Sequence, residues 1–136
     1  GPFGFFVFDE KSKHQEHCFI GAGTGLAPLY SIIKEHLPHH PDTKFTLLFG
    51  TKTQQTLLLH QELQQLAAHY PHFAYIPTLS RESWKGKTGR VQEHIGNNFK
   101  NKTFYICGLK ELVLETKELL LKKGVDVKDI KYERYS

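Results

Sequence analysis

Long hydrophobic runs and cysteines are both scarce in this sequence, and each scarcity narrows the class of protein. No apolar run approaches the roughly 20 residues of a membrane-spanning helix, so no membrane span is expected. The first residues, GPFGFFVFDEKSKH, lack the basic leader and the small-residue cleavage site of a secretory signal. The two cysteines, Cys18 and Cys107, each lie inside an apolar segment, which favours buried, reduced thiols in a cytoplasmic protein over a disulfide framework.

The usual patterns of metal and nucleic-acid sites are missing too. The nine histidines show no spacing typical of a zinc site, and the two cysteines are distant from each other, so no bound metal is expected. A net charge of +4 and a pI near 9.0 suit an anionic ligand. The lysines are scattered, however, and no basic stripe is interleaved with aromatics, so no nucleic-acid partner is expected. With 39% hydrophobic and 24% charged residues, the 136-residue chain suffices for one globular domain with a core.

Apolar segments that predict strands alternate with amphipathic segments that predict helices. The expected strands cover residues 3–8, 18–20, 44–49, 73–79, 102–106 and 130–135, and the expected helices cover residues 26–37, 53–70, about 90–95, and 109–123. Pro77 should lie at a sheet edge, and Gly124 should end the last helix. The buried strands are continuously apolar, which is typical of a parallel sheet covered on both faces. The sequence therefore predicts an α/β fold, a doubly wound, Rossmann-like parallel sheet of about five strands with helices on both faces.

A glycine-rich turn is the most informative stretch. CFIGAGTGLAPLYSIIKEHL, from Cys18 to Leu37, predicts a buried strand, a glycine turn and a helix with Pro28 in its first turn. Such a turn directs backbone N–H groups and the positive end of the helix dipole at one point, where an anion, most often a phosphate, binds. Gly23 and Gly25 would let a pyrophosphate approach the backbone, and Thr24 either adds a hydroxyl or caps the helix. A turn made only for tight folding is the alternative.

Ligands of doubly wound sheets bind beyond the carboxyl ends of the strands. Five segments should therefore meet at one crevice: Gly21–Gly25, Gly50–Thr51, Thr78–Arg81, Cys107–Gly108 and Glu133–Ser136. Within them, Arg81 offers a charged fork suited to phosphate, or is a solvated loop arginine. Cys107 is either a small group at the edge of a ligand ring or a buried hydrophobe.

These segments resemble, in order and spacing, the motifs of the nicotinamide-nucleotide-binding domain of the ferredoxin–NADP reductase family of flavoenzymes. The matching segments are the GPxG-like Gly1–Gly4, the GxGTGxxP turn Gly21–Pro28, the SRE triplet Ser80–Glu82, CGLK at Cys107–Lys110 and the terminal E-x-Y at Glu133–Tyr135. The resemblance covers nearly the whole chain. It implies that residues 1–9 end the connection from a flavin-binding barrel and that residues 10–136 form the NAD(P)-binding domain.

The resemblance also implies roles for single residues. In the family, the glycine turn holds the pyrophosphate, the SRE triplet grips the adenosine 2′-phosphate, and the CGLK cysteine borders the nicotinamide. Cys107 and Glu133 are the implied catalytic residues, with Glu133 relaying a proton or fixing the flavin ring, or else a plain edge-strand carboxylate. The implied cofactor-binding residues are Gly21, Gly23, Thr24, Gly25, Pro28, Gly50, Thr51, Ser80, Arg81, Arg90, Cys107, Gly108, Leu109 and Tyr135.

The choice of dinucleotide is open, with a slight lean to NADPH from SRE and CGLK. Arg90 stands where plant-type members of the family carry an adenine-stacking tyrosine. Residues Trp84–Gly89 resemble the W-x-G-x-x-G loop of NADH-using oxygenase reductases, and Ser136 follows the tyrosine that ends plant-type chains. These departures from the plant-type pattern keep NADH as an alternative to NADPH.

The implied function is that of the NAD(P)H-binding domain of a flavin-dependent oxidoreductase. Hydride would pass from the nicotinamide to FAD held by a missing N-terminal domain, and electrons would pass on to a ferredoxin or another iron–sulfur partner. The isolated domain should be inactive without its FAD domain. The alternatives are an NADH-dependent reductase component of an oxygenase system and a non-catalytic nucleotide-binding module.

Overall fold

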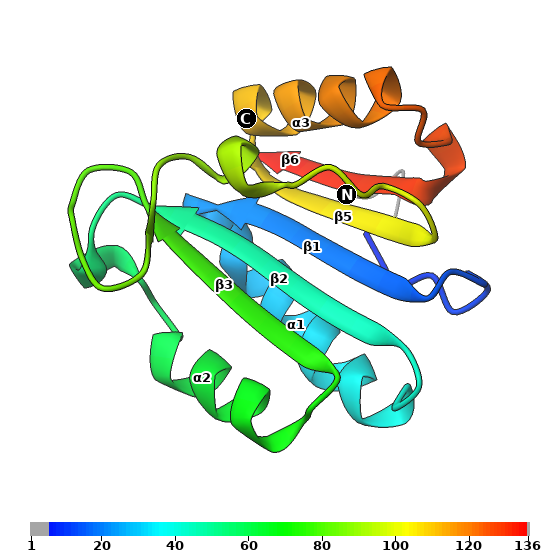
Figure 1. The fold of residues 1–136 in the computed structure, drawn as a ribbon, viewed down its shortest axis with the longest axis horizontal. Helices are drawn as coiled ribbons and strands as arrows, with labels where there is room; N and C mark the ends of the chain where they lie inside the picture. Colours follow the sequence, from blue (N-terminus) through cyan, green and yellow to red (C-terminus); the bar gives the residue numbers. More distant parts are fainter. Residues whose placement is uncertain (1–5, 136) are drawn as a thin grey trace.

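The computed structural model describes residues 6–135, and of Tyr135 the backbone alone. These residues form a six-stranded sheet in the order β4-β3-β2-β1-β5-β6, with every neighbouring pair parallel (Figure 1). The strands are β1 (Glu16–Ala22), β2 (Lys44–Thr51), β3 (Phe73–Leu79), β4 (Lys87–Thr88), β5 (Lys102–Leu109) and β6 (Ile130–Tyr135). The predicted doubly wound parallel sheet is confirmed. Its additional strand is β4, whose two residues pair with Thr78 and Leu79 of β3.

Helices cover both faces of the sheet, as predicted. Among the described residues they are α1 (Leu26–His36), α2 (His60–His69) and α3 (Lys110–Lys122), with the short 3-10 turns η1 (Gly23–Gly25), η2 (Leu37–His39), η3 (Gln54–Thr56), η4 (Val91–His94) and η5 (Val127–Asp129). Helices α1 and α2 pack on one face and α3 on the other (Figure 1). No helix within residues 6–135 combines the length and the apolar character needed to cross a membrane.

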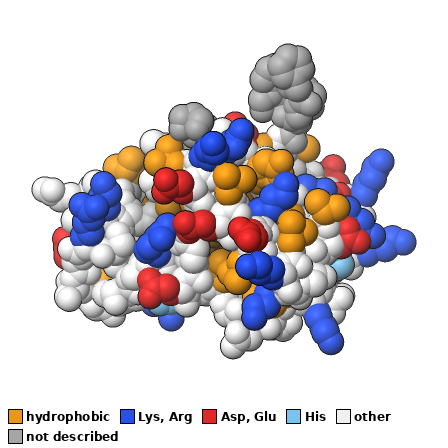
Figure 2. Space-filling view, turned by 90° about the horizontal axis from the view of Figure 1, so that it is seen from above, with side chains coloured by type: hydrophobic (Ala, Val, Ile, Leu, Met, Phe, Trp, Pro, Cys, Tyr) orange, Lys and Arg blue, Asp and Glu red, His pale blue; other side chains and the backbone are white. Residues whose placement is uncertain are grey.

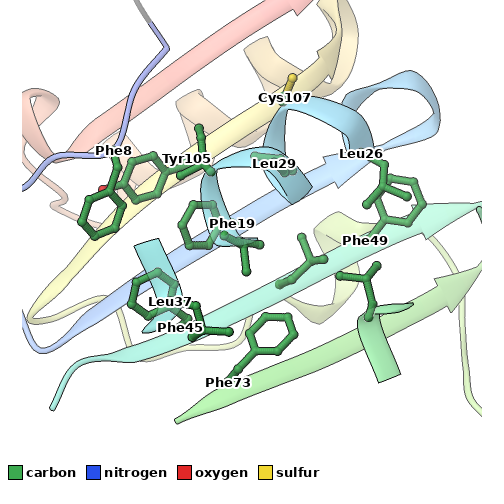
Figure 3. Packing of buried hydrophobic residues seen from close by; sticks show 14 of the residues in the cluster. Phe8, Phe19, Leu26, Leu29, Leu37, Phe45, Phe49, Phe73, Tyr105 and Cys107 are labelled. Atoms are coloured by element: carbon green, nitrogen blue, oxygen red, sulfur yellow. The ribbon is translucent and has the colours of Figure 1, made fainter. Parts of the chain in front are cut away.

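Alternating side chains along the strands build two separate cores. On β1, Phe19 belongs to the core beneath α1 and α2, and the next residue, Ile20, belongs to the core beneath α3. Figure 3 shows the first core, in which the rings of Phe19 and Tyr105 stack with their centroids 4.5 Å apart. Because both faces of these strands are buried, their sequences are continuously apolar.

The strand predicted over residues 3–8 is wrong where the structure describes it. Residues 6–8 are not in a strand, and residues 3–5, like the GPxG-like start, lie outside the described residues. Phe8 is only 7% exposed and packs against the rings of His17 and Phe45. Phe8 is therefore buried by filling the end of the α1-side core, without pairing to the sheet.

The helix predicted to begin at Thr53 is divided into two elements. Thr53 and Thr56 form a reciprocal capping box on η3. Leu57 then turns into the core while Leu58 is 67% exposed. Leu59 has a left-handed φ of 57°, a conformation through which a right-handed helix cannot continue. For this reason α2 begins only at His60.

Two predictions that rest on single residues, Pro77 at the edge of the sheet and Gly124 at the end of α3, are confirmed. Pro77 pairs with β2 on one side and lies just before Thr78, where β4 begins to pair on the other side. Its missing N–H therefore falls at an unpaired stretch of the edge. Gly124 follows α3 with a φ of 89°, and the N–H of Val125 donates to the carbonyl of Leu120 at 3.1 Å, as in a Schellman motif.

Candidate functional site

A cavity of about 660 Å³ opens at the carboxyl edge of the sheet. Its walls come from the ends of β1, β2, β3 and β5, from η3 and η4, and from the start of α3. The lining residues are Ala22, Gly23, Thr24, Gly50, Thr51, Lys52, Thr56, Leu58, Ser80, Gly89, Arg90, Val91, Gln92, Leu109, Glu111 and Leu112. This is the edge at which the sequence predicts a ligand crevice.

The cavity brings together predicted cofactor-binding residues from four strand ends and from η4. They are Gly23, Thr24, Gly50, Thr51, Ser80, Arg90 and Leu109. The predicted residues that lie outside its lining are Gly21, Gly25, Pro28, Arg81, Cys107, Gly108 and Glu133. The side chain of Tyr135 and all of Ser136 lie outside the described residues.

The three glycines of the turn, Gly21, Gly23 and Gly25, have different structural roles. Gly23 has a φ of +57°, and a Cβ built on it would meet no atom within 4 Å, so its backbone faces the open cavity. A Cβ on Gly25 would overlap the backbone carbonyl of Cys107, and one on Gly21 would come within 2.6 Å of Leu29 Cδ1. Gly23 thus leaves room for a ligand, whereas Gly21 and Gly25 let the start of α1 pack directly on β5.

The N-terminus of α1 lies beside the cavity-lining Gly23 and Thr24. No side-chain hydrogen bond caps this end of the helix, and Pro28 lies in its first turn, where a missing N–H costs no helical bond. Thr24 is exposed and makes no cap, which leaves its hydroxyl on the cavity side of the turn. The positive end of the helix dipole and an accessible backbone together suit a phosphate group.

The loop after β3 is fixed at both of its ends. The N–H groups of Ser80 and Arg81 donate to the carbonyls of Thr51 and Lys52, each at 3.0 Å. At the far end, the N–H of Gly89 donates to the carbonyl of Leu79 at 2.8 Å. Ser80 is thereby held on the cavity wall, while the exposed Arg81 side chain lies outside the lining.

Arg90 is the arginine that lines the cavity. It precedes η4, and its guanidinium lies 3.3 Å from Glu115 Oε2 on α3. Gln92 donates to the same carboxylate oxygen at 2.9 Å. Gly50 lies beneath η4, because a Cβ there would come within 2.7 Å of Val91 Cγ1. The Glu115 contact therefore holds a positive charge at the cavity rim.

Some lining residues were not predicted from the sequence. Lys52 and Thr56 line the cavity, and the Thr56 hydroxyl lies 2.7 Å from that of Thr51. Lys52 immediately follows the strand end Gly50–Thr51, so its position at a carboxyl strand end was an available signal. Thr56 reaches the cavity only because η3 turns the chain back toward β2, a turn with no signal in the apolar periodicity.

Cys107 and Glu133 lie side by side but away from the cavity lining. They are register partners on β5 and β6, so their side chains project from the same face of the sheet. Cys107 is fully buried in the α1-side core, and Glu133 is half-buried. A Cβ at Gly108 would lie 2.8 Å from Leu112 Cδ2, so that leucine side chain would have to shift to admit it.

The other cysteine, Cys18, belongs to the core, as predicted. Its thiol donates to Glu16 Oε2 at 3.1 Å. Burial raises the pKa of the Cys18 thiol, and the neighbouring Glu16 carboxylate raises it further. Burial also tends to raise the pKa of Glu16, but hydrogen bonds from Thr46 and Cys18 and the charge of Lys102 outweigh it, so that this pKa is lowered. Cys18 is accordingly a neutral thiol and no nucleophile.

The surface around α3 carries charges of both signs. In Figure 2, Lys and Arg side chains are interspersed with Asp and Glu and with hydrophobic side chains. The exposed hydrophobic residues include Leu109, Leu114, Leu121 and Tyr132.

Comparisons with known proteins agree with this geometry. Residues 19–118 match the family model described as the oxidoreductase NAD-binding domain. The chain is 31% identical over 147 residues to ferredoxin–NADP reductase B of Sorangium cellulosum, with 99% of this chain and 60% of the relative covered. It is 35% identical over 129 residues to the NADH nitrate reductase of Volvox carteri, with 84% of this chain and 15% of the relative covered.

A solved structure has the same fold. The FAD/NAD-binding domain of a nitric oxide dioxygenase from Vibrio cholerae superposes with a TM-score of 0.84 at 25% identity, covering 97% of this chain and 55% of that one. This chain therefore spans between 15% and 60% of the length of these proteins.

Proposed function

The chain belongs to the family of oxidoreductase NAD-binding domains of ferredoxin–NADP reductase-like flavoenzymes, and we propose that it binds NAD(P)H in the cavity at the carboxyl edge of its sheet. The family uses NAD(P)H together with FAD. The observation that carries the proposal is the cavity, where an open glycine backbone and the N-terminus of α1 meet the ends of four strands.

The residues of the chain would position the dinucleotide. The backbone at Gly23 and Thr24 would hold the pyrophosphate, aided by the α1 dipole. Thr51 and Ser80 offer hydroxyl groups along the wall. When bound, NAD(P)H and FAD would supply hydride transfer from the nicotinamide to the flavin. We assign Glu133, on the other face of the same edge, to contacts with the nicotinamide and flavin rings. Cys107 beside it is fully buried, so its own contact with the nicotinamide requires that the groups covering it move aside.

We further propose a preference for NADPH. A 2′-phosphate carries charge that guanidinium and ammonium groups recognise. Lys52, Ser80 and Arg90 line the cavity, and Arg81 extends from the loop that carries Ser80. These groups support a phosphate-binding end of the site.

The test is a calorimetric titration of the 136-residue chain with NADPH and with NADH. NADPH should bind more tightly, and Arg90→Ala should raise its Kd at least about tenfold, because a charged hydrogen bond contributes roughly 1.5–3 kcal/mol. Arg81→Ala should have a similar effect. NADH affinity should change less than twofold in both variants, since that ligand lacks the 2′-phosphate.

Lys122→Ala is the matched control, because Lys122 is exposed at the end of α3 and pairs with Glu118 at 3.5 Å. Equal affinities for the two dinucleotides, with Arg81→Ala and Arg90→Ala both harmless, would contradict the NADPH preference. If neither NADPH nor NADH binds, the proposed site is wrong.

NADH is the second candidate, favoured by Glu82. This carboxylate follows Arg81 and accepts a hydrogen bond from Gln54 Nε2 at 2.8 Å, next to the η3 turn that lines the cavity. A carboxylate there would repel a 2′-phosphate and could accept a hydrogen bond from a ribose hydroxyl. The Volvox relative carries NADH in its name. In the titration above, Glu82→Gln should then strengthen NADPH binding.

The remaining assignments concern the protein as a whole. We propose that residues 1–9 connect to a flavin-binding domain and that residues 10–136 are the NAD(P)-binding domain. We propose a ferredoxin or another iron–sulfur protein as the acceptor of the electrons, and negligible diaphorase activity for this chain alone. We also propose a cytoplasmic location, which the burial of the Cys18 thiol in the core supports.

A further inference from the structure

Three side chains meet at the amino-terminal edge of the sheet, opposite the cavity. Glu10 precedes β1, His36 is the last residue of α1, and His40 follows η2. His36 Nδ1 lies 3.7 Å and His40 Nε2 lies 4.0 Å from Glu10 Oε1. The three ligand atoms are all within 4.8 Å of one another. We propose that this cluster, the Glu10 site, binds one divalent transition-metal ion, for which Zn²⁺ is the best match.

The separations are close to those of a bound ion. Nitrogen and oxygen ligands about 2.0–2.2 Å from zinc, at tetrahedral angles, are roughly 3.4 Å apart. The two observed separations, 3.7 and 4.0 Å, are slightly longer and share one atom, Glu10 Oε1. The Glu10 side chain is 67% exposed and can turn toward the histidines. The two imidazole nitrogens, within 4.8 Å of each other, must also draw closer to complete the geometry. Three protein ligands leave the fourth position to water.

The two imidazoles are oriented by a buried ring. The His36 ring stacks on Phe8 with centroids 4.4 Å apart and an interplanar angle of 14°, and the His40 ring lies 4.9 Å from the same ring. His36 also places its other nitrogen, Nε2, 3.3 Å from Glu35 Oε2. A carboxylate at the outer nitrogen of a metal-binding histidine fixes its tautomer and raises its basicity, and this leaves Nδ1 for the ion.

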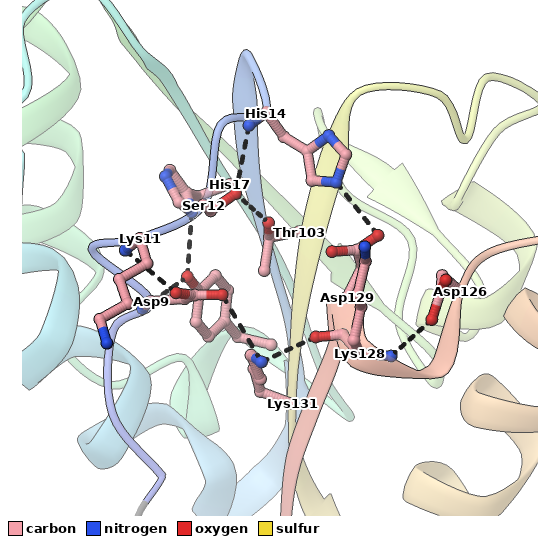
Figure 4. Close-up of polar contacts among 11 residues, drawn as sticks. Asp9, Lys11, Ser12, His14, His17, Thr103, Asp126, Lys128, Asp129 and Lys131 are labelled. Carbon is pink, nitrogen blue, oxygen red and sulfur yellow. Dashed lines mark hydrogen bonds and ion pairs between the residues drawn. The ribbon is translucent and has the colours of Figure 1, made fainter.

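The segment that carries Glu10 is held in place on the other side. Figure 4 shows Asp9 joined to Lys131, whose Nζ lies 3.5 Å from Asp9 Oδ2. The N–H of Asp9 donates to the Tyr105 hydroxyl at 3.1 Å. The Ser12 hydroxyl lies 2.7 Å from that of Thr103. Glu10 is therefore presented to the two histidines by a segment anchored before and after it.

The chemistry of the donors selects the ion. Two imidazoles and one carboxylate suit Zn²⁺, Cu²⁺ or Ni²⁺, whereas Mg²⁺ and Ca²⁺ prefer oxygen ligands alone. The C-terminus of α1, where His36 lies, also favours a cation. A bound ion would join residues 8–10 to the end of α1 and stabilise this edge of the domain, far from the proposed dinucleotide site.

The test uses tag-free, chelator-treated protein and Zn²⁺ in competition with a chromophoric chelator. One equivalent of Zn²⁺ should bind with a micromolar Kd and raise the thermal unfolding midpoint by several degrees. Glu10→Gln and His40→Gln should each weaken binding at least tenfold. Co²⁺ in place of Zn²⁺ should give the visible absorption of a four-coordinate site, and both variants should abolish it.

His39→Gln is the matched control, because His39 is an exposed neighbour outside the cluster. It should leave the Zn²⁺ affinity unchanged. Glu10→Gln keeps the proposal testable even if a histidine variant disturbs the packing of Phe8. Binding that is equally strong in wild type, Glu10→Gln and His40→Gln, or no binding below about 100 µM Zn²⁺ in wild type, would overturn the proposal.

Discussion

At the scale of single residues, the glycine turn separates folding from ligand binding. Gly25 has an ordinary φ of −72°, yet it has no room for a side chain, because the Cys107 carbonyl occupies the place of its Cβ. Gly23 is the reverse case, with a left-handed φ of +57° and open space around it. The two positions therefore respond to the same substitution for different reasons.

Gly25→Ala should destabilise the protein by about 3 kcal/mol, because its methyl group would clash with backbone atoms that cannot move aside. Gly23→Ala should cost only about 1 kcal/mol, the penalty of a left-handed alanine, but should weaken dinucleotide binding. Urea unfolding and dinucleotide titration of the two variants measure both effects. A Gly25→Ala variant as stable as Gly23→Ala would show that α1 does not pack on β5 as described.

At the scale of elements, helix α3 ends in a glycine C-cap that makes both hydrogen bonds of a Schellman motif. Gly124 has a φ of 89°, and a Cβ at this position would meet no atom within 4 Å. The N–H groups of Gly124 and Val125 donate to the carbonyls of Leu121 and Leu120, both at 3.1 Å. The cost of a side chain at Gly124 is therefore purely conformational.

Gly124→Ala should lower the free energy of unfolding by about 1 kcal/mol, because alanine resists the left-handed conformation. Gly124→Asn should lower it by less, since asparagine tolerates that conformation better. Chemical denaturation of the three proteins gives the ranking. Equal stability of the alanine and asparagine variants, or a loss of several kcal/mol in either, would point to a steric cause instead.

Element prediction succeeded where burial on two faces decides the pattern and failed where nothing in the residue type marks the break. The strands from residues 18, 44, 73 and 102 are predominantly apolar and were found, as was the more polar edge strand from residue 130. The break at Leu59 was missed, because no glycine or proline marks its left-handed φ. The segment ending at Phe8 has strand-like composition, but the ring of Phe8 fills the end of the core and residues 6–8 do not pair with the sheet.

At the scale of the whole molecule, the sequence predicts the sheet and the edge that carries the site, because parallel strands place their carboxyl ends together. It does not predict which strand-end side chains face the cavity. Arg81 and Cys107 lie at the right edge but outside the lining. The Glu10 site was not predicted either: His36 and His40 are four residues apart, but Glu10 joins them only through the packing of Phe8.

The free energy of unfolding, measured as a function of pH, should reveal the protonation of His17, whose ring contacts several parts of the molecule. It is 3% exposed, and its Nδ1 lies 2.9 Å from the Tyr105 hydroxyl. Burial, helped by the nearby His40, lowers its pKa from 6.5 to about 4, although Asp9 acts in the opposite sense. The unfolded chain therefore binds a proton between pH 6.5 and 4 that the folded protein does not.

The free energy of unfolding should consequently fall as the pH is lowered through this range, by up to about 3 kcal/mol from His17 alone. In His17→Asn, which keeps a polar atom near the place of Nδ1, the fall should be smaller by that amount. Denaturant unfolding at several pH values gives both curves. Parallel curves for the two proteins would mean that His17 is protonated in the folded state.

The burial of Phe8 has a mechanical consequence. Its ring lies within 6.0 Å, centre to centre, of five other rings. These belong to His17 on β1, His36 at the end of α1, His40 after η2, Phe45 on β2 and Tyr105 on β5. Residues 8 and 9 cannot swing without pulling this ring out of the core. They must therefore rotate and translate with the sheet as one body.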